Sequence, residues 1–144
     1  MREGKRNIVA GLTILAGFMF YGFVLIYLRD FAPDKEAWIA SYGAGKHFES
    51  RLAHAHGNLF ALLNVVFGFL LLRLPLTGPQ ARWISWLVLV GLLMPIGILA
   101  EVLLGVPPIL VLVGGLSMLV GTAWLGVAVA RLPHPAHSDA GMRP

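Results

Sequence analysis

The chain has no cysteine and few charged residues, and both absences narrow what it can be. Without cysteine among the 144 residues there is no disulfide, no thiolate metal ligand and no cysteine nucleophile. Charged side chains make up 12% of the sequence and hydrophobic ones 58%, and the mean hydropathy is +0.79. A soluble globular domain carries about twice this charged fraction. The composition therefore indicates a membrane protein.

Four long segments without a charged residue can each cross a bilayer, because a helix needs about 20 apolar residues to span a hydrocarbon core of about 30 Å. The fourth opens with the helix-breaking turn Gly105-Val106-Pro107-Pro108, so its helix starts near Pro108. We predict an all-α membrane protein in which residues 1–131 form a four-helix transmembrane bundle. A disordered cytoplasmic tail, 132–144, follows, and its histidines are poor site candidates. The predicted helices cover about residues 8–28, 50–72, 83–104 and 108–130.

The distribution of basic residues predicts the orientation of the chain. Seven of the eleven lysines and arginines lie on the side of the two termini, and four lie on the side of the long loop 29–50, where acidic residues offset them. Because cytoplasmic loops are rich in Lys and Arg, we expect both termini in the cytoplasm and the chain in the cell inner membrane. The net charge of +4 thus reflects topology, and we predict no nucleic-acid partner.

Aromatic and small residues suggest contacts at the membrane surface and between helices. Trp38 and Tyr42 in the long loop suit an interfacial anchor, with a short helix lying on the surface. Small side chains let membrane helices approach closely, within a subunit or between subunits. We expect the small-residue face of the last helix to help form a homo-oligomer. This face comprises Gly114, Ser117, Gly121 and Ala128, and Thr122 and Gly126 make a second small pair on another face.

Polar residues gather near the outer ends of three helices. His54 and His56 lie about one to two turns inside the second helix, Glu101 lies about one turn inside the third, and Tyr27 is near the outer end of the first. Ionisable residues within membrane segments are rare, costly and usually face the bundle interior. This layer is the strongest functional signal in the sequence.

The two histidines of the second helix point in different directions. His54 shares a face with Asn58 and with Arg51, and His47 joins this face if the helix starts early enough. His56 points about 160° away, at about 100° per residue. Because residues two apart on a helix do not face each other, the His-x-His pair is a poor zinc chelator. A single imidazole can still serve as an axial ligand of haem iron.

Structural roles remain open for the same residues. The histidines can hydrogen-bond lipid headgroups or loop carbonyls, and Glu101 can pair with Arg51. Asn58 and Asn64 can join neighbouring helices by hydrogen bonds, which is the favoured role for the deeper Asn64. Pro95 is expected to kink the third helix, because proline frees a backbone carbonyl.

The segment RLAHAHGNLFALLN, which opens the second helix, resembles the corresponding part of the styrene oxide isomerase and hydroxylaminobenzene mutase group of small membrane proteins. That group shares the four helices and the long first loop, and it carries Ala-His, then Gly and Asn, in this helix. Two pairs match the Ala-His equally well, Ala53-His54 and Ala55-His56, with Gly57 following both. Neither Asn58 nor Asn64 has the expected spacing of six from its histidine, and the tyrosine of the third helix has no counterpart.

The resemblance implies a trimer that binds haem b between subunits through the motif's histidine. Ferric iron would act as a Lewis acid that rearranges an epoxide to a carbonyl compound, and the small apolar substrate would enter from the bilayer. Carried over to this chain, the iron ligand is His54 or alternatively His56, and Arg51 or Lys46 would lie near the haem propionates. The implied substrate-orienting residues are Asn58, and Glu101 or Tyr27 in place of the missing tyrosine.

Two other functions stay open at this point. A b-type haem protein for electron transfer or sensing would have both axial positions filled, by His54 with His47 or by histidines from two subunits. A non-catalytic membrane subunit or small transporter would use Glu101 and the histidines to carry protons. The absorbance spectrum of the purified protein separates these functions from an isomerase.

Overall fold

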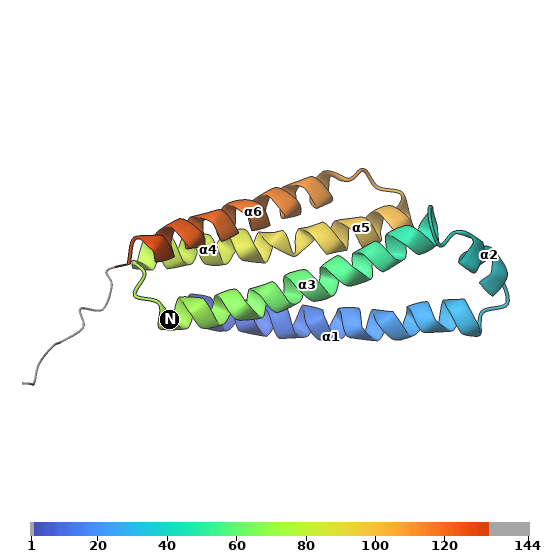
Figure 1. Cartoon of the computed structure of the whole chain (residues 1–144), viewed down its shortest axis with the longest axis horizontal. Helices are drawn as coiled ribbons and strands as arrows, with labels where there is room; N and C mark the ends of the chain where they lie inside the picture. The colour runs from blue at the N-terminus through green and yellow to red at the C-terminus, as the bar shows by residue number, and fades with distance from the viewer. Residues whose placement is uncertain (1, 133–144) are drawn as a thin grey trace, which may run out of the picture.

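The computed structural model describes residues 2–132, which are helical almost throughout and contain no strand. Figure 1 shows long helices lying side by side and a short helix near one end. The helices are α1 (Arg2–Asp30), α2 (Lys35–Ala40), α3 (Lys46–Arg73), α4 (Gly78–Gly91), α5 (Leu93–Leu104) and α6 (Ile109–Ala130). Four segments, α1, α3, α4 with α5, and α6, are each long and apolar enough to cross a membrane. The all-α fold with four such helices is therefore confirmed, whereas the tail predicted to be disordered lies outside the described residues from position 133 onward.

The helices extend beyond the charge-free segments that predicted them. α1 begins at Arg2 instead of residue 8, α3 at Lys46 instead of residue 50, and α4 at Gly78 instead of residue 83. Thr77 and Gln80 form a capping box that fixes the start of α4. The length of a charge-free segment reflects the thickness of the hydrocarbon core. The helix that contains it can be longer, because its backbone hydrogen bonds continue into the polar boundary of the membrane.

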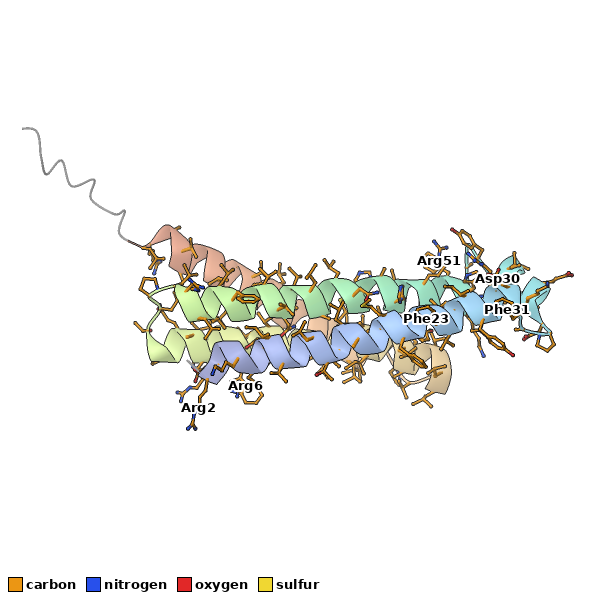
Figure 2. All side chains as sticks on the ribbon, turned by 90° about the horizontal axis from the view of Figure 1, so that it is seen from below. Arg2, Arg6, Phe23, Asp30, Phe31 and Arg51 are labelled. Atoms are coloured by element: carbon orange, nitrogen blue, oxygen red, sulfur yellow. The ribbon has the colours of Figure 1, made fainter. Side chains whose placement is uncertain are left out.

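The two ends of the bundle carry different connections. The start of α1, the α3–α4 turn and the end of α6 lie at one end, here called the terminal end (Figure 1). α2 and the α5–α6 turn lie at the other, here called the α2 end. Figure 2 places Arg2 and Arg6 at the terminal end, and Arg51 and Asp30 at the α2 end. α3 packs against α1, α4 and α5 and also touches α2, whereas among the described helices α6 contacts only α4 and α5.

The third membrane helix breaks at Leu92, three residues before Pro95, as the sequence predicts. At the break the Leu92 N–H donates to Leu89 O at 3.1 Å and not to Val88 O. The Val88 carbonyl instead accepts a hydrogen bond of 3.0 Å from Asn64 Nδ2 of α3. A neighbouring helix thus supplies the donor, which is how membrane proteins tolerate such breaks.

Asn64 is part of a fully buried polar cluster near the terminal end that joins α1, α3 and α4. Asn7 Nδ2 donates to Asn64 Oδ1 at 3.1 Å and to Ser85 O at 3.2 Å, and Ser85 Oγ donates to Asn7 Oδ1. All three side chains are 0% exposed. The favoured role of Asn64, hydrogen bonding between helices, is therefore confirmed.

The small-residue face of α6 packs inside the subunit. Gly114, Gly121 and Ala128 are buried. A side chain at Gly114 would overlap the Met94 backbone, and a Cβ at Gly121 would lie 3.0 Å from Val88 Cγ2. These glycines let α6 approach the broken α4–α5 helix within the subunit, and the contribution of this face to a homo-oligomer stays a prediction. Nothing lies within 4 Å of a Cβ at Gly126, in the second small pair.

Candidate functional site

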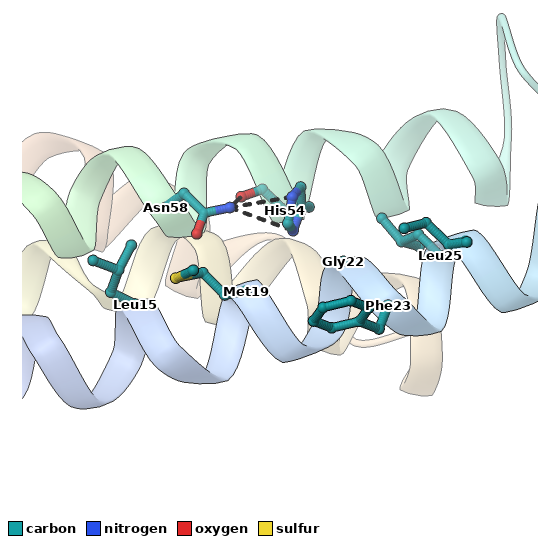
Figure 3. Close-up of a pocket in the computed structure, with 8 residues that line it drawn as sticks. Leu15, Met19, Gly22, Phe23, Leu25, His54 and Asn58 are labelled. Atoms are coloured by element: carbon teal, nitrogen blue, oxygen red, sulfur yellow. Dashed lines mark hydrogen bonds between the residues drawn. The ribbon is translucent and has the colours of Figure 1, made fainter.

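A pocket of about 590 Å³ lies between α1 and α3, in the half of the bundle nearer the α2 end (Figure 3). Its volume is in the range of small-molecule sites, about 300–1,000 Å³. The walls are mostly aliphatic and aromatic, and His54 and Asn58 are the two polar side chains among the eight that line it. The lining residues are Leu15, Met19, Gly22, Phe23, Leu25, Ile26, His54 and Asn58. We call this space the α1–α3 pocket.

Two glycines set the register of α1 against α3 and so position His54. Gly22 of α1 faces the imidazole, and a Cβ there would lie 2.9 Å from His54 Cε1. Gly57 of α3 lies against the Phe18 ring, and a side chain there would overlap that ring. Each helix therefore uses a glycine to accept a ring from the other. Gly57, which follows both Ala-His pairs, thus has a packing role in this chain.

His54 and Asn58 form one polar group on the wall of the pocket. Asn58 Nδ2 donates to His54 O at 3.0 Å and lies 3.2 and 3.4 Å from Nε2 and Nδ1 of the His54 ring. Figure 3 shows this amide nitrogen directed along α3 toward the ring. Asn58 Oδ1 is buried and has no hydrogen-bond partner within residues 2–132. The pair therefore retains hydrogen-bonding capacity that the described part of the chain leaves unused.

Two smaller pockets continue this space toward the α2 end. One, of about 230 Å³, shares Leu25 and Ile26 with the α1–α3 pocket and is also lined by Arg29, Tyr42, His47 and Arg51. We call it the mouth pocket. The other, of about 340 Å³, shares His54 with the α1–α3 pocket and is also lined by Phe48, Arg51, Leu52 and Ala55. Arg51 and His54 thus connect the apolar pocket to the end of the bundle.

His47 holds α2 against the start of α3. Its Nδ1 donates to Trp38 O at 2.9 Å, its ring stacks on Trp38 with centroids 4.7 Å apart, and the Tyr42 ring meets it edge-on at 5.2 Å. The imidazole is 5% exposed. Because α3 starts at Lys46, His47 does lie within this helix, and it lines the mouth pocket with Arg51. Its bonding is that of a structural residue that fastens the loop.

The other predicted site residues do not line the α1–α3 pocket. His56 Nδ1 donates to Leu52 O at 3.0 Å, and its ring meets Phe60, so it faces away from His54 as the helical wheel predicts. Tyr27 is exposed and stacks on Phe31. Glu101 is exposed, and its side chain makes no hydrogen bond or ion pair within the described residues, including none with Arg51.

Tyr21 is a residue near His54 that the sequence did not single out. Its ring centroid lies 6.4 Å from that of His54, and it lines a small pocket of about 140 Å³ with Phe18 and Leu99. The α1–α3 register explains this: Gly22 is beside His54, so Tyr21 and not Tyr27 is level with the imidazole. His54 is eight residues into α3, about 12 Å from its start.

Comparisons of the chain with protein-family models, curated proteins and solved structures find no match. Within residues 2–132 there is also no group of three or more His, Asp or Glu side chains that could hold a metal ion. A metal bound to side chains alone is thus unsupported, and the site's chemistry depends on what a single imidazole and one amide can bind.

Proposed function

We propose that this protein binds haem b in the α1–α3 pocket and is a membrane isomerase that rearranges a small apolar epoxide to a carbonyl compound. The observation that carries the proposal is the position of His54. It presents one imidazole, beside one amide, in a pocket otherwise lined by apolar side chains and a glycine. The reaction type comes from the resemblance of the RLAHAHGNLFALLN segment to the styrene oxide isomerase group. The geometry of the site is compatible with this reaction but does not by itself select it.

The residues of the pocket suit a haem with one protein ligand. A neutral imidazole has one unprotonated nitrogen to ligate iron, and Asn58, whose amide N–H donates to the His54 backbone carbonyl, lies beside the ring. The aliphatic walls suit an apolar macrocycle, and Arg51 lies in the adjoining pockets, where carboxylates would emerge. Bound ferric haem would supply a Lewis acid that polarises an epoxide oxygen.

Two further residues have proposed roles beside the imidazole. Asn58 would orient the substrate through its amide NH2 group, because an epoxide oxygen only accepts hydrogen bonds and this group has a second N–H beside the one that donates to His54 O. We propose Tyr21 as the second polar group, in place of Tyr27 and Glu101, because the Tyr21 ring lies near that of His54. Only α1 and α3 line the pocket, so a neighbouring subunit has room to close it.

An electron-transfer haem with two histidine ligands from one chain has weaker support. His47, the natural second ligand, is stacked on Trp38 and bonded to its carbonyl. Moving it to the iron would release α2 from α3. A bis-histidine site would therefore need a histidine from a second subunit.

The proposal also includes the placement of the chain in the cell. We propose that the terminal end faces the cytoplasm and that the protein resides in the inner membrane, since the positive charge is concentrated at that end. A homo-oligomer, a trimer by resemblance, would cover the side of the α1–α3 pocket that this chain leaves open. Gly126 and Thr122 of α6 are exposed and offer a further contact face.

The test is haem quantification and absorbance spectroscopy of protein purified in mild detergent from haem-replete cells. We expect a high-spin ferric spectrum for the parent protein and for His56→Ala, which is the matched control one half-turn away. His54→Ala should lose haem. The parent protein should then rearrange an aryl epoxide without an added electron donor. A colourless parent protein would refute the haem proposal, and a low-spin spectrum would favour the bis-histidine alternative.

A further inference from the structure

We propose that the mouth pocket is an anion site in which Arg51 holds the carboxylate of an amphipathic ligand whose apolar body occupies the α1–α3 pocket. The inference rests on the same pocket as the proposed function and names the chemistry of what that pocket accepts. It does not depend on iron, because haem with its propionates is only one member of this ligand class.

The charge of Arg51 is available, whereas that of its neighbour Arg29 is not. Arg29 Nε and Nη2 donate to both carboxylate oxygens of Asp30, at 2.8 and 2.7 Å. Arg51 makes no ion pair within residues 2–132, and its guanidinium lies over the Tyr42 ring, 3.9 Å from the centroid. Such stacking leaves the edge of the guanidinium, with its N–H donors, free for a carboxylate.

The surroundings of Arg51 favour a single anionic group. Tyr42 also lines the mouth pocket, and its hydroxyl can contribute a hydrogen-bond donor. Tyr42 is itself held in place by His47, so the face on which Arg51 rests is fixed by the α2–α3 contact. Among the described residues, no acidic side chain lines the mouth pocket. An incoming carboxylate therefore meets positive charge without a competing negative one in the wall.

The two pockets share a wall, so one molecule can occupy both. Leu25 and Ile26 line the apolar and the cationic space alike. From Leu15 at the inner end to Ile26 at the mouth, α1 rises by about 16 Å. This length of apolar wall, with a cation at one end only, matches an alkyl or polycyclic body that carries one terminal anion.

The experiment measures binding of dodecanoate brominated next to its carboxyl group, and of its methyl ester, to the full chain in neutral-lipid nanodiscs. Bromine held near Arg51 should quench Trp38, which stacks on the pocket residue His47. The other three tryptophans are at positions 83, 86 and 124, on α4 and α6. A Trp38→Phe variant measures the quenching that does not come from this site.

The parent protein should bind the carboxylate about tenfold or more tightly than the ester, as expected for a charge-assisted hydrogen bond. Arg51→Gln should remove this preference and Arg51→Lys should keep part of it. Arg73→Gln, an exposed arginine at the opposite end of α3, should leave it unchanged. Equal binding of acid and ester by the parent protein, or an unchanged preference in Arg51→Gln, would overturn the proposal.

Two further measurements complete the test. One distinguishes a lipid phosphate from a free carboxylate, and the other tests the anion site independently of the haem proposal. Competition by phosphatidylglycerol in the nanodisc would support the anion site and assign it to a lipid phosphate, whereas binding without competition supports a free carboxylate. His54→Ala should keep the acid-over-ester preference even though we expect it to bind no haem. Loss of the preference in this variant would contradict an anion site centred on Arg51.

Discussion

Replacing Asn64 by leucine should destabilise the bundle, because this side chain supplies two hydrogen bonds between helices. Its Oδ1 accepts from Asn7 of α1 at 3.1 Å, and its Nδ2 donates to the Val88 carbonyl of α4 at 3.0 Å. Leucine has a similar volume but can do neither. The Val88 carbonyl would then lose its donor at the helix break, where Leu92 N–H already donates to Leu89 O.

The size of the effect follows from these two bonds. Hydrogen bonds between membrane helices contribute about 0.6 kcal/mol on average and up to about 1.7 kcal/mol. Two such bonds give an expected loss of about 1–3 kcal/mol in the free energy of unfolding. Asn58→Leu is the matched control on the same helix, because the hydrogen bonds of Asn58 go only to His54. Its stability should change by less than about 0.5 kcal/mol.

Unfolding in mixed micelles of mild detergent and dodecyl sulfate, followed by circular dichroism, measures both variants. A double-mutant cycle with Asn7→Leu then isolates the bond between the two asparagines, and the two substitutions should be less than additive. If Asn64→Leu unfolds at the same dodecyl sulfate fraction as the parent protein, the polar cluster does not hold the helices together. A loss of the same size in Asn58→Leu would also contradict the reasoning.

Three other outcomes test the fold. Gly57→Leu should lower stability sharply, because the side chain would overlap Phe18, whereas Gly17→Leu should be tolerated, since nothing lies within 4 Å of a Cβ there; the same unfolding assay compares them. Gly121→Leu should destabilise the subunit, while Gly126→Leu should leave its stability unchanged and lower the mass of the assembly measured by light scattering in detergent. A C-terminal reporter enzyme that works only in the periplasm should be inactive, and activity would reverse the proposed orientation.

The helices could be predicted from the sequence because spanning a membrane depends on each segment alone. About 20 apolar residues make a span whatever they pack against. The break near Pro95 and the role of Asn64 were predictable for the same reason: a missing N–H and a deep amide each have few structural options. None of these predictions needs knowledge of which helix faces which.

The site was harder to predict because it depends on the register between α1 and α3. Contacts of Gly22 with His54 and of Phe18 with Gly57 set this register. The positions of the apolar segments in the sequence do not indicate which residues of the two helices lie side by side. The sequence therefore pointed to Tyr27, when Tyr21 is the tyrosine level with the imidazole. Glu101 was expected to face the interior, but it lies three residues from the end of α5, where a charge can reach the polar boundary.

The two ends of the bundle differ in how completely their polar groups are bonded, and this difference supports the proposed site toward the α2 end. Near the terminal end, Asn7, Asn64 and Ser85 are fully buried and bonded to one another. Toward the α2 end, Asn58 Oδ1 has no partner and Arg51 no ion pair within the described residues, and both line pockets. A buried polar group without a partner is destabilising, so Asn58 Oδ1 is expected where a ligand completes it, whereas the exposed Arg51 is free to bind an anion. Asn64→Leu should therefore lower stability and spare ligand binding, and Asn58→Leu should do the reverse; the opposite pattern would place the ligand near the terminal end.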